Sequence, residues 1–129
     1  MDFTTHGAEQ TLKWVMGESA APPTVFYIQL HVGDPGPIGV DNPAQNTERQ
    51  PVTFAPVVTD PGTDGSAHAE TNLVAAWTNA PAAETYTHVT VWDAETGGNC
   101  WYKTEMVLAT PVVVGGMFAF ADGQKVTHL

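Results

Sequence analysis

Proline and glycine interrupt this chain so often that few long elements can form. The 129 residues include ten prolines and twelve glycines. These residues divide the sequence into short stretches at roughly ten-residue spacing, which suits strands joined by turns and does not suit a helical bundle. The spacing therefore predicts a β-rich chain, and the length fits one domain.

Alternating apolar side chains predict about seven or eight strands. The clearest is 24–32, where every second residue is apolar until Gly-Asp-Pro-Gly-Pro stops the pattern. The strongest hairpin signal is the Gly-Gly turn at 97–98, and we expect Val89 and Val91 to face inward there, with Tyr86 on the opposite face. The strands are expected at 24–32, 51–58, 70–77, 86–92, 99–108, 112–114, 117–121 and 124–129.

Residues 4–16 form the one convincing helical stretch, which Thr4 or Thr5 can cap and Gly17 can end. Its apolar stripe consists of Ala8, Leu12, Val15 and Met16. So short a helix is marginal alone, and its stripe must dock on something. The predicted organisation is a helix and linker at 1–23, followed at 24–129 by an all-β domain, a β-sandwich or open barrel.

Charge excludes several classes of partner. Fourteen acidic residues oppose four basic ones, and the formal net charge is −10. This balance repels phosphate and anionic lipid, so we expect neither nucleic-acid nor membrane binding. The start of the chain lacks the pattern of a signal peptide, and no apolar stretch approaches the ~18 residues of a membrane span. Only 14% of residues are charged, which suits a chain that is buried in an assembly.

No pattern in the sequence has the spacing of a catalytic or metal site. The histidines do not recur at ligand spacing, and the loop from Asp60 to Gly65 lacks the alternation of a calcium loop. No nucleophile elbow occurs. Cys100 is the only cysteine, so we expect an inert packed thiol and no intrachain disulfide. The prediction is a protein that is not an enzyme, with no catalytic residue, cofactor or metal.

Contact with other subunits is the remaining hypothesis for the helix and for the long loop at 33–50. A loop of this length without periodicity is usually functional. The predicted contact residues are Leu12, Trp14, Val15, Asp34, Pro35, Pro37 and Arg49. Arg49 is the only arginine, and we expect a carboxylate partner on this or a neighbouring subunit. The alternative is that the helix caps its own domain and Arg49 meets a local acid. Trp92 and Trp101 are open to three roles: core, interface anchor or sugar-stacking platform.

Three segments carry a resemblance to a known family. They are 26–36 (FYIQLHVGDPG), 87–99 (THVTVWDAETGGN) and 115–123 (GGMFAFADG). In this order they resemble a family of small tailed-phage virion proteins, often labelled tail-fibre or minor structural proteins, in phages of actinobacteria and other hosts. The resemblance implies a non-enzymatic virion protein that is assembled in the host cytoplasm.

These observations leave two hypotheses for the position of the protein in the phage particle, and a third hypothesis outside it. A capsid decoration protein on the outside of the head is the first hypothesis, because the chain lacks the repeat or coiled coil of a fibre shaft. A tail-tip, tail-fibre or baseplate component is the alternative, and a carbohydrate-binding module is a third hypothesis from another class. The expected partners are the major capsid protein or other virion proteins, and copies of the chain itself, with a homotrimer slightly favoured.

Overall fold

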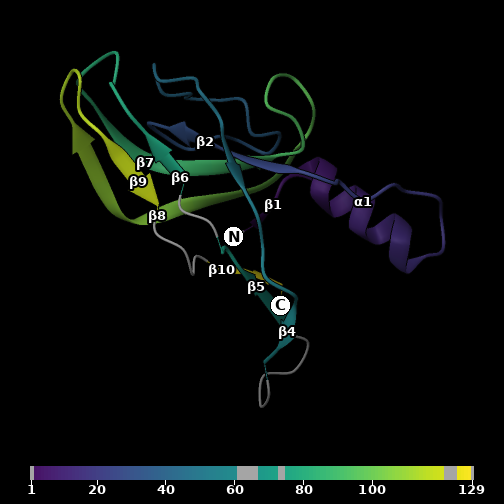
Figure 1. Ribbon diagram of the computed structural model, residues 1–129. Coiled ribbons are helices and arrows are strands. Elements are labelled where there is room, and N and C mark those ends of the chain that lie inside the picture. The colour runs from purple at the N-terminus through teal and green to yellow at the C-terminus, as the bar shows by residue number, and fades with distance from the viewer. Residues whose placement is uncertain (1, 61–66, 73–74, 121–124, 129) are drawn as a thin grey trace.

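A computed structural model describes residues 2–60, 67–72, 75–120 and 125–128 of the 129-residue chain. Within them, one helix accompanies ten short strands (Figure 1), which confirms the predicted all-β fold with an N-terminal helix. The elements are β1 (Asp2–Phe3), α1 (Thr5–Val15), β2 (Phe26–His31), β3 (Gln50–Val52), β4 (Val58–Thr59), β5 (Ala67–Glu70), β6 (Ala75–Trp77), β7 (Glu84–Trp92), β8 (Cys100–Val112), β9 (Phe118–Phe120) and β10 (Lys125–His128).

A five-stranded antiparallel sheet forms the body, in the order β1-β8-β7-β2-β3. The predicted hairpin is its centre, made of β7 and β8. Two smaller sheets accompany it: β6 pairs with β9, and β5 pairs with both β4 and β10. The β4–β5–β10 sheet extends away from the main body, at the bottom of Figure 1. The main sheet is therefore the platform from which the other elements project.

The core lies between one face of the main sheet and the β6–β9 pair. As the alternation predicts, Ile28, Leu30, Val89 and Val91 are buried together on this face, and Trp77 of β6 packs with them. Burial of one such side chain contributes about 1.5–3 kcal/mol. The cluster is completed by Ala44, Val52, Ala75, Tyr86 and Phe118.

Tyr86 corrects the predicted alternation. We expected it opposite Val89, but it lies in the same core and is 1% exposed. The cause is an irregularity in the pairing: Tyr86 pairs with Thr110 and His88 with Glu105, which leaves Thr87 facing the four residues 106–109. The extra residues on β8 form a bulge, which changes the side chains that share one face of the sheet. The alternation of apolar residues along one strand does not reveal such a bulge.

Several predicted strands have different bounds. The stretch 51–58 is divided between β3 and β4, and 70–77 holds the end of β5 and all of β6. The stretch 112–114 is not a separate strand, because β8 ends at Val112. Short strands such as β1 fall below what alternation can detect. Parts of the predicted turn at 60–66 and of the strands at 70–77, 117–121 and 124–129 lie outside the described residues.

Helix α1 falls within the predicted 4–16. Thr4 caps it, since its hydroxyl oxygen accepts a hydrogen bond from the Gly7 N–H at 3.2 Å. Gly17 follows the last turn with φ of +78°, the left-handed conformation that glycine adopts without strain. The helix extends from the main sheet as an arm, at the right of Figure 1.

Candidate assembly surface

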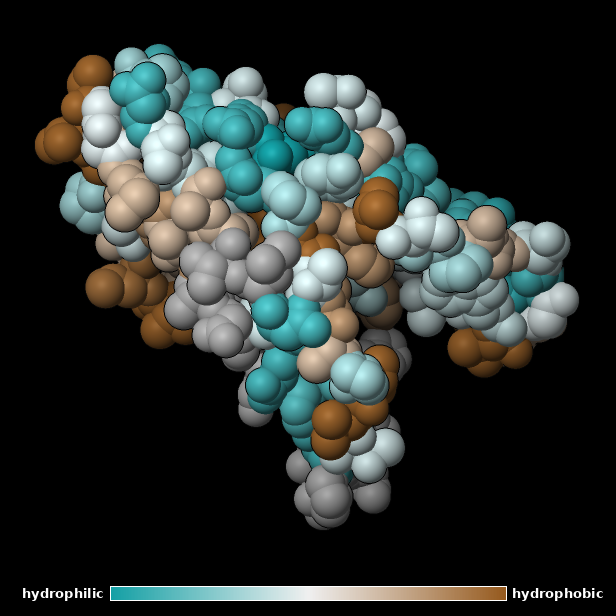
Figure 2. All heavy atoms as spheres, viewed as in Figure 1, coloured by the Kyte–Doolittle hydropathy of each residue, from teal (hydrophilic) through white to brown (hydrophobic). Residues whose placement is uncertain are grey.

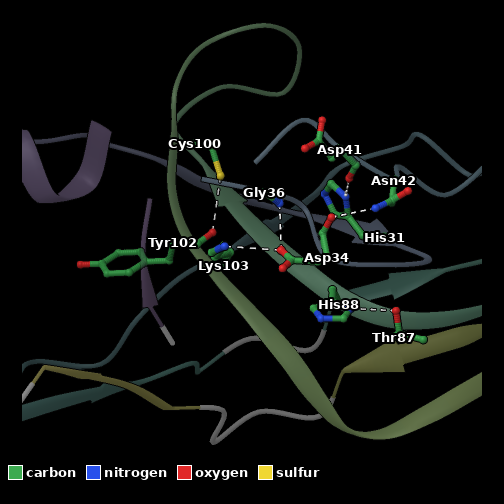
Figure 3. Close-up of polar contacts among 10 residues, drawn as sticks. All are labelled: His31, Asp34, Gly36, Asp41, Asn42, Thr87, His88, Cys100, Tyr102 and Lys103. Atoms are coloured by element: carbon green, nitrogen blue, oxygen red, sulfur yellow. Dashed lines mark hydrogen bonds and ion pairs between the residues drawn. The ribbon is translucent and has the colours of Figure 1, made fainter. Parts of the chain in front are cut away.

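The loop between β2 and β3 begins with the predicted contact residues, and it folds back onto its own domain. The Asp34 carboxylate accepts a hydrogen bond from the Gly36 N–H at 2.9 Å and lies 3.4 Å from the Lys103 ammonium (Figure 3). These two contacts, the Gly36 bond first, lower the pKa of Asp34. Pro35 is fully buried, and the Pro37 carbonyl accepts a hydrogen bond from the Thr5 N–H at 2.9 Å. This part of the loop therefore supports the start of α1.

Gly39 marks the closest approach of the loop to the sheet. Its φ is +81°, and a Cβ at this position would lie 2.4 Å from the Cys100 sulfur. Cys100 is buried, and burial raises the pKa of its thiol to about 12. At neutral pH the thiol is therefore protonated and unreactive, as expected of a packed cysteine.

His31 joins the loop to the face of the sheet opposite the core, a role that the sequence pattern did not assign to it. Its side chain is completely buried, with Nδ1 2.9 Å from the Asp41 carbonyl oxygen and Nε2 2.8 Å from the Thr90 hydroxyl (Figure 3 draws the first contact). A carbonyl oxygen only accepts, so Nδ1 carries the proton and Nε2 accepts from Thr90. Burial lowers the pKa of His31, and these partners suit the neutral ring.

Arg49 closes the loop against the β7–β8 turn. Its Nη1 donates to the carbonyl oxygens of Ala94 at 2.8 Å and Gly97 at 2.7 Å, and its Nε donates to the Gln29 side chain at 2.9 Å. The guanidinium carbon lies 3.9 Å from the centre of the Trp92 ring. Among the residues that the structure describes, its partners are thus carbonyl groups and an aromatic ring instead of the carboxylate that we expected.

Trp101 attaches α1 to the sheet. Its carbonyl oxygen accepts a hydrogen bond from the Thr4 N–H at 3.0 Å, and its ring stacks on Trp14 with centroids 5.9 Å apart. A Cβ on Gly7 would lie 2.2 Å from the same carbonyl, so only glycine permits this approach. Trp92 and Trp101 are both buried. They are packing residues of this domain, and neither ring forms an exposed platform for a sugar.

The apolar stripe of α1 points away from this attachment. Leu12 is 60% exposed, Val15 71% and Met16 63%. Brown, hydrophobic spheres accordingly gather on one side of the arm (Figure 2). Helix α1 therefore contacts its own sheet through Gly7 and Trp14, and the stripe takes no part in that contact. We call Leu12, Val15 and Met16 the arm stripe.

Sequence reasoning missed a second exposed apolar region, on β8 and the turn that follows it. The irregular pairing opposite Thr87 displays Val107, which is fully exposed, and Leu108, which is 77% exposed. The turn adds the exposed side chains of Val113, Val114 and Met117. The stretch 106–121 is the longest in the sequence without a charged residue, and that was the available signal.

An apolar groove lies between the main sheet and the β4–β5 strands. Its volume is about 280 Å³, and the rings of Phe26 and Phe54 meet in it at 90° with centroids 5.4 Å apart. Among the residues that the structure describes, its lining has no charged side chain and consists of Phe26, Phe54, Ala55, Pro56, Val57, Ala69 and Tyr102. We call these seven residues the apolar groove.

Among residues 2–60, 67–72, 75–120 and 125–128, no three His, Cys, Asp or Glu side chains gather as they do around a metal ion. Across those ranges there is also no helix with the length and apolar character to cross a membrane.

The fold is that of a small β-rich module with exposed apolar side chains on an arm and on a bulged strand, and with an apolar groove. Residues 2–127 match the family described as podophage GP4 fiber I protein gp80, and the chain belongs to this family. The match includes α1 as well as the sheets, and it confirms the phage virion structural family that the three sequence segments indicate. No curated protein sequence matches the chain.

Proposed function

We propose that this chain is a non-enzymatic structural subunit of a phage particle, most specifically a fibre component that works through contacts with other virion proteins. Its membership of a podophage fibre family favours a fibre component over a capsid decoration protein. Sequence reasoning ranked capsid decoration first because the chain lacks a fibre shaft. A small module of this kind fits the attachment or end domain of a fibre, for which no shaft is needed.

The arm stripe is the observation that carries the proposal. Three large apolar side chains are exposed to solvent on a helix that Trp14 and Gly7 already attach to the sheet. Isolated exposed apolar residues are ordinary, but a contiguous stripe on a projecting helix is typical of an interaction surface. Burial of each such side chain against a partner contributes about 1.5–3 kcal/mol.

The loop contributes less to this surface than the sequence predicts. Asp34, Pro35 and Arg49 are engaged within the chain. Ile38 and Val40 remain exposed, at 57% and 52%, close in sequence to the Pro37 carbonyl that receives α1. We propose that these two residues add to the contact with a neighbouring subunit at the N-terminal end of α1, while the arm stripe makes the contact at the C-terminal end. A homotrimer remains our preferred assembly.

The test is incorporation into particles. A variant with L12Q, V15Q and M16Q removes the arm stripe without touching Trp14. Its control is V107Q with L108Q, which removes exposed apolar side chains on β8. We expect the arm variant to be at least about tenfold depleted from purified particles, because ~1.4 kcal/mol of lost contact already changes binding tenfold. Equal incorporation of the arm variant and wild type would contradict the proposal.

Position in the particle is tested separately. Immunogold electron microscopy with a C-terminal label should mark the tail and its fibres. Label spread over the head, in register with the capsomers, would instead support capsid decoration with the major capsid protein as partner. Either pattern is compatible with an arm that docks on a virion protein, so the two tests are independent.

A further inference from the structure

We propose that the partner of the arm stripe is a second copy of this chain, and that the stripe of one copy docks in the apolar groove of the next. This inference rests on the proposed function, since it assigns a binding site to the arm. Four properties of the two surfaces carry it.

The arm stripe has the spacing of a helix that binds in a groove. Leu12, Val15 and Met16 stand at positions i, i+3 and i+4, so their side chains lie on one side of α1. This is the arrangement by which amphipathic helices insert anchors into a hydrophobic groove. Thr4 and Trp101 already hold the first turn, so little helical order has to be acquired on binding.

The apolar groove provides the matching surface. Phe26, Phe54 and Tyr102 give it aromatic walls, and Ala55 and Ala69 leave room between them. Aromatic side chains around a cavity of this kind are typical of sites that receive aliphatic anchors.

Charge permits a contact between these two surfaces. Each copy carries a formal charge of −10, so two copies repel one another over most of their surfaces. The arm stripe and the groove lining contain no charged side chain. A contact between them therefore buries apolar area and desolvates no carboxylate.

The two surfaces lie on different faces of the main sheet, so one copy does not fill its own groove. Helix α1 starts from the Pro37 carbonyl, on the loop that covers the face of His31 and Thr90. Phe26 and Tyr102 of the groove pack against the core on the other face. A contact between unlike surfaces is heterologous, and its repetition gives a closed ring or a filament. Reciprocal exchange of arms between two copies would close a dimer, and the preferred homotrimer is the next larger closed ring.

Complementation between two defective variants tests the inference. The arm variant is L12Q with V15Q and M16Q. The groove variant is P56D with V57D, at two exposed positions that line the groove. V58D is its control, because Val58 is also exposed but does not line the groove. Circular dichroism and melting curves establish that each variant is folded.

In sedimentation velocity, we expect concentration-dependent oligomers for wild type and V58D, and monomers for the arm and groove variants at the same concentrations. An equal mixture of the two variants should form a 1:1 dimer that grows no further, since only one intact arm and one intact groove can meet. Three results would each overturn the inference. The wild type could stay monomeric up to about 1 mM, the groove variant could assemble like V58D, or the mixture of variants could stay monomeric. If the arm variant is nevertheless depleted from particles, the proposed function stands and the arm binds a different virion protein.

Discussion

The 33–49 loop and helix α1 differ in how they are held. The loop has no regular structure, yet it is fixed along its length by Gly39 against Cys100, by the neighbouring His31, and by Arg49 against the β7–β8 turn. Helix α1 is regular, yet it contacts the sheet on one side only, at Trp101. Irregular backbone can thus belong to the stable body of a small domain, while a regular element remains available to a partner. Four variants examine this difference, first at the loop and its contacts and then in the arm.

Gly39→Ala should produce the largest loss of stability. The new Cβ would combine a left-handed φ of +81° with a contact of 2.4 Å to the Cys100 sulfur. Strain and overpacking together should lower the free energy of unfolding by about 3–4 kcal/mol, measured by urea denaturation. Gly97→Ala is the matched control, because Gly97 has φ of +63° and no atom within 4 Å of the added Cβ. Equal losses in the two variants would mean that the loop does not pack against Cys100.

Arg49→Ala should have the next largest effect. It removes two hydrogen bonds to carbonyls, one to Gln29 and the contact with Trp92. We expect a loss of about 2–3 kcal/mol in the same assay. Arg49→Lys keeps the charge but not the planar fork, and it should recover only part of this loss. Full recovery by lysine would show that charge alone fixes the loop.

His31 should make the stability of the loop depend on pH. Its folded-state pKa is lowered, chiefly by burial and further by the charges of His88 and Arg49. The unfolded chain therefore binds a proton first, and stability is lost as pH falls from about 6.5 towards the lower folded pKa. Melting curves of wild type and His31→Gln across this range should converge as pH falls. Parallel curves would indicate that His31 is not the titrating group.

The arm variant L12Q/V15Q/M16Q should change stability least. All three side chains are exposed, and surface substitutions usually change the free energy of unfolding by no more than about 0.5 kcal/mol each. Its melting temperature should therefore stay close to that of wild type, in contrast to Arg49→Ala. Early melting or aggregation of this variant would restore the alternative in which the stripe caps its own domain.

Local pattern predicted the elements but not their long-range contacts. Helix α1, strand β2 and the β7–β8 hairpin follow from spacing and turn residues, because these signals lie within a few neighbouring positions. The place of Tyr86 in the core depends on a bulge between strands, and the carbonyl partners of Arg49 lie 45 and 48 positions away. Periodicity identifies an apolar stripe, but not whether a chain's own sheet or another molecule covers it. Leu12 and Val15 are exposed and stay candidates for a contact with another subunit, while the role of His31 was missed.

Methionine oxidation in the intact particle tests the central claim most directly. Met16 belongs to the arm stripe and is 63% exposed, and Met117 lies in the turn after β8 and is 69% exposed. In the free chain both should react with dilute peroxide at similar rates, because oxidation follows exposure. In assembled particles, peptide mass spectrometry should find Met16 oxidised severalfold more slowly than in the free chain, with Met117 unchanged. Equal oxidation of Met16 in the particle and in the free chain would contradict the account.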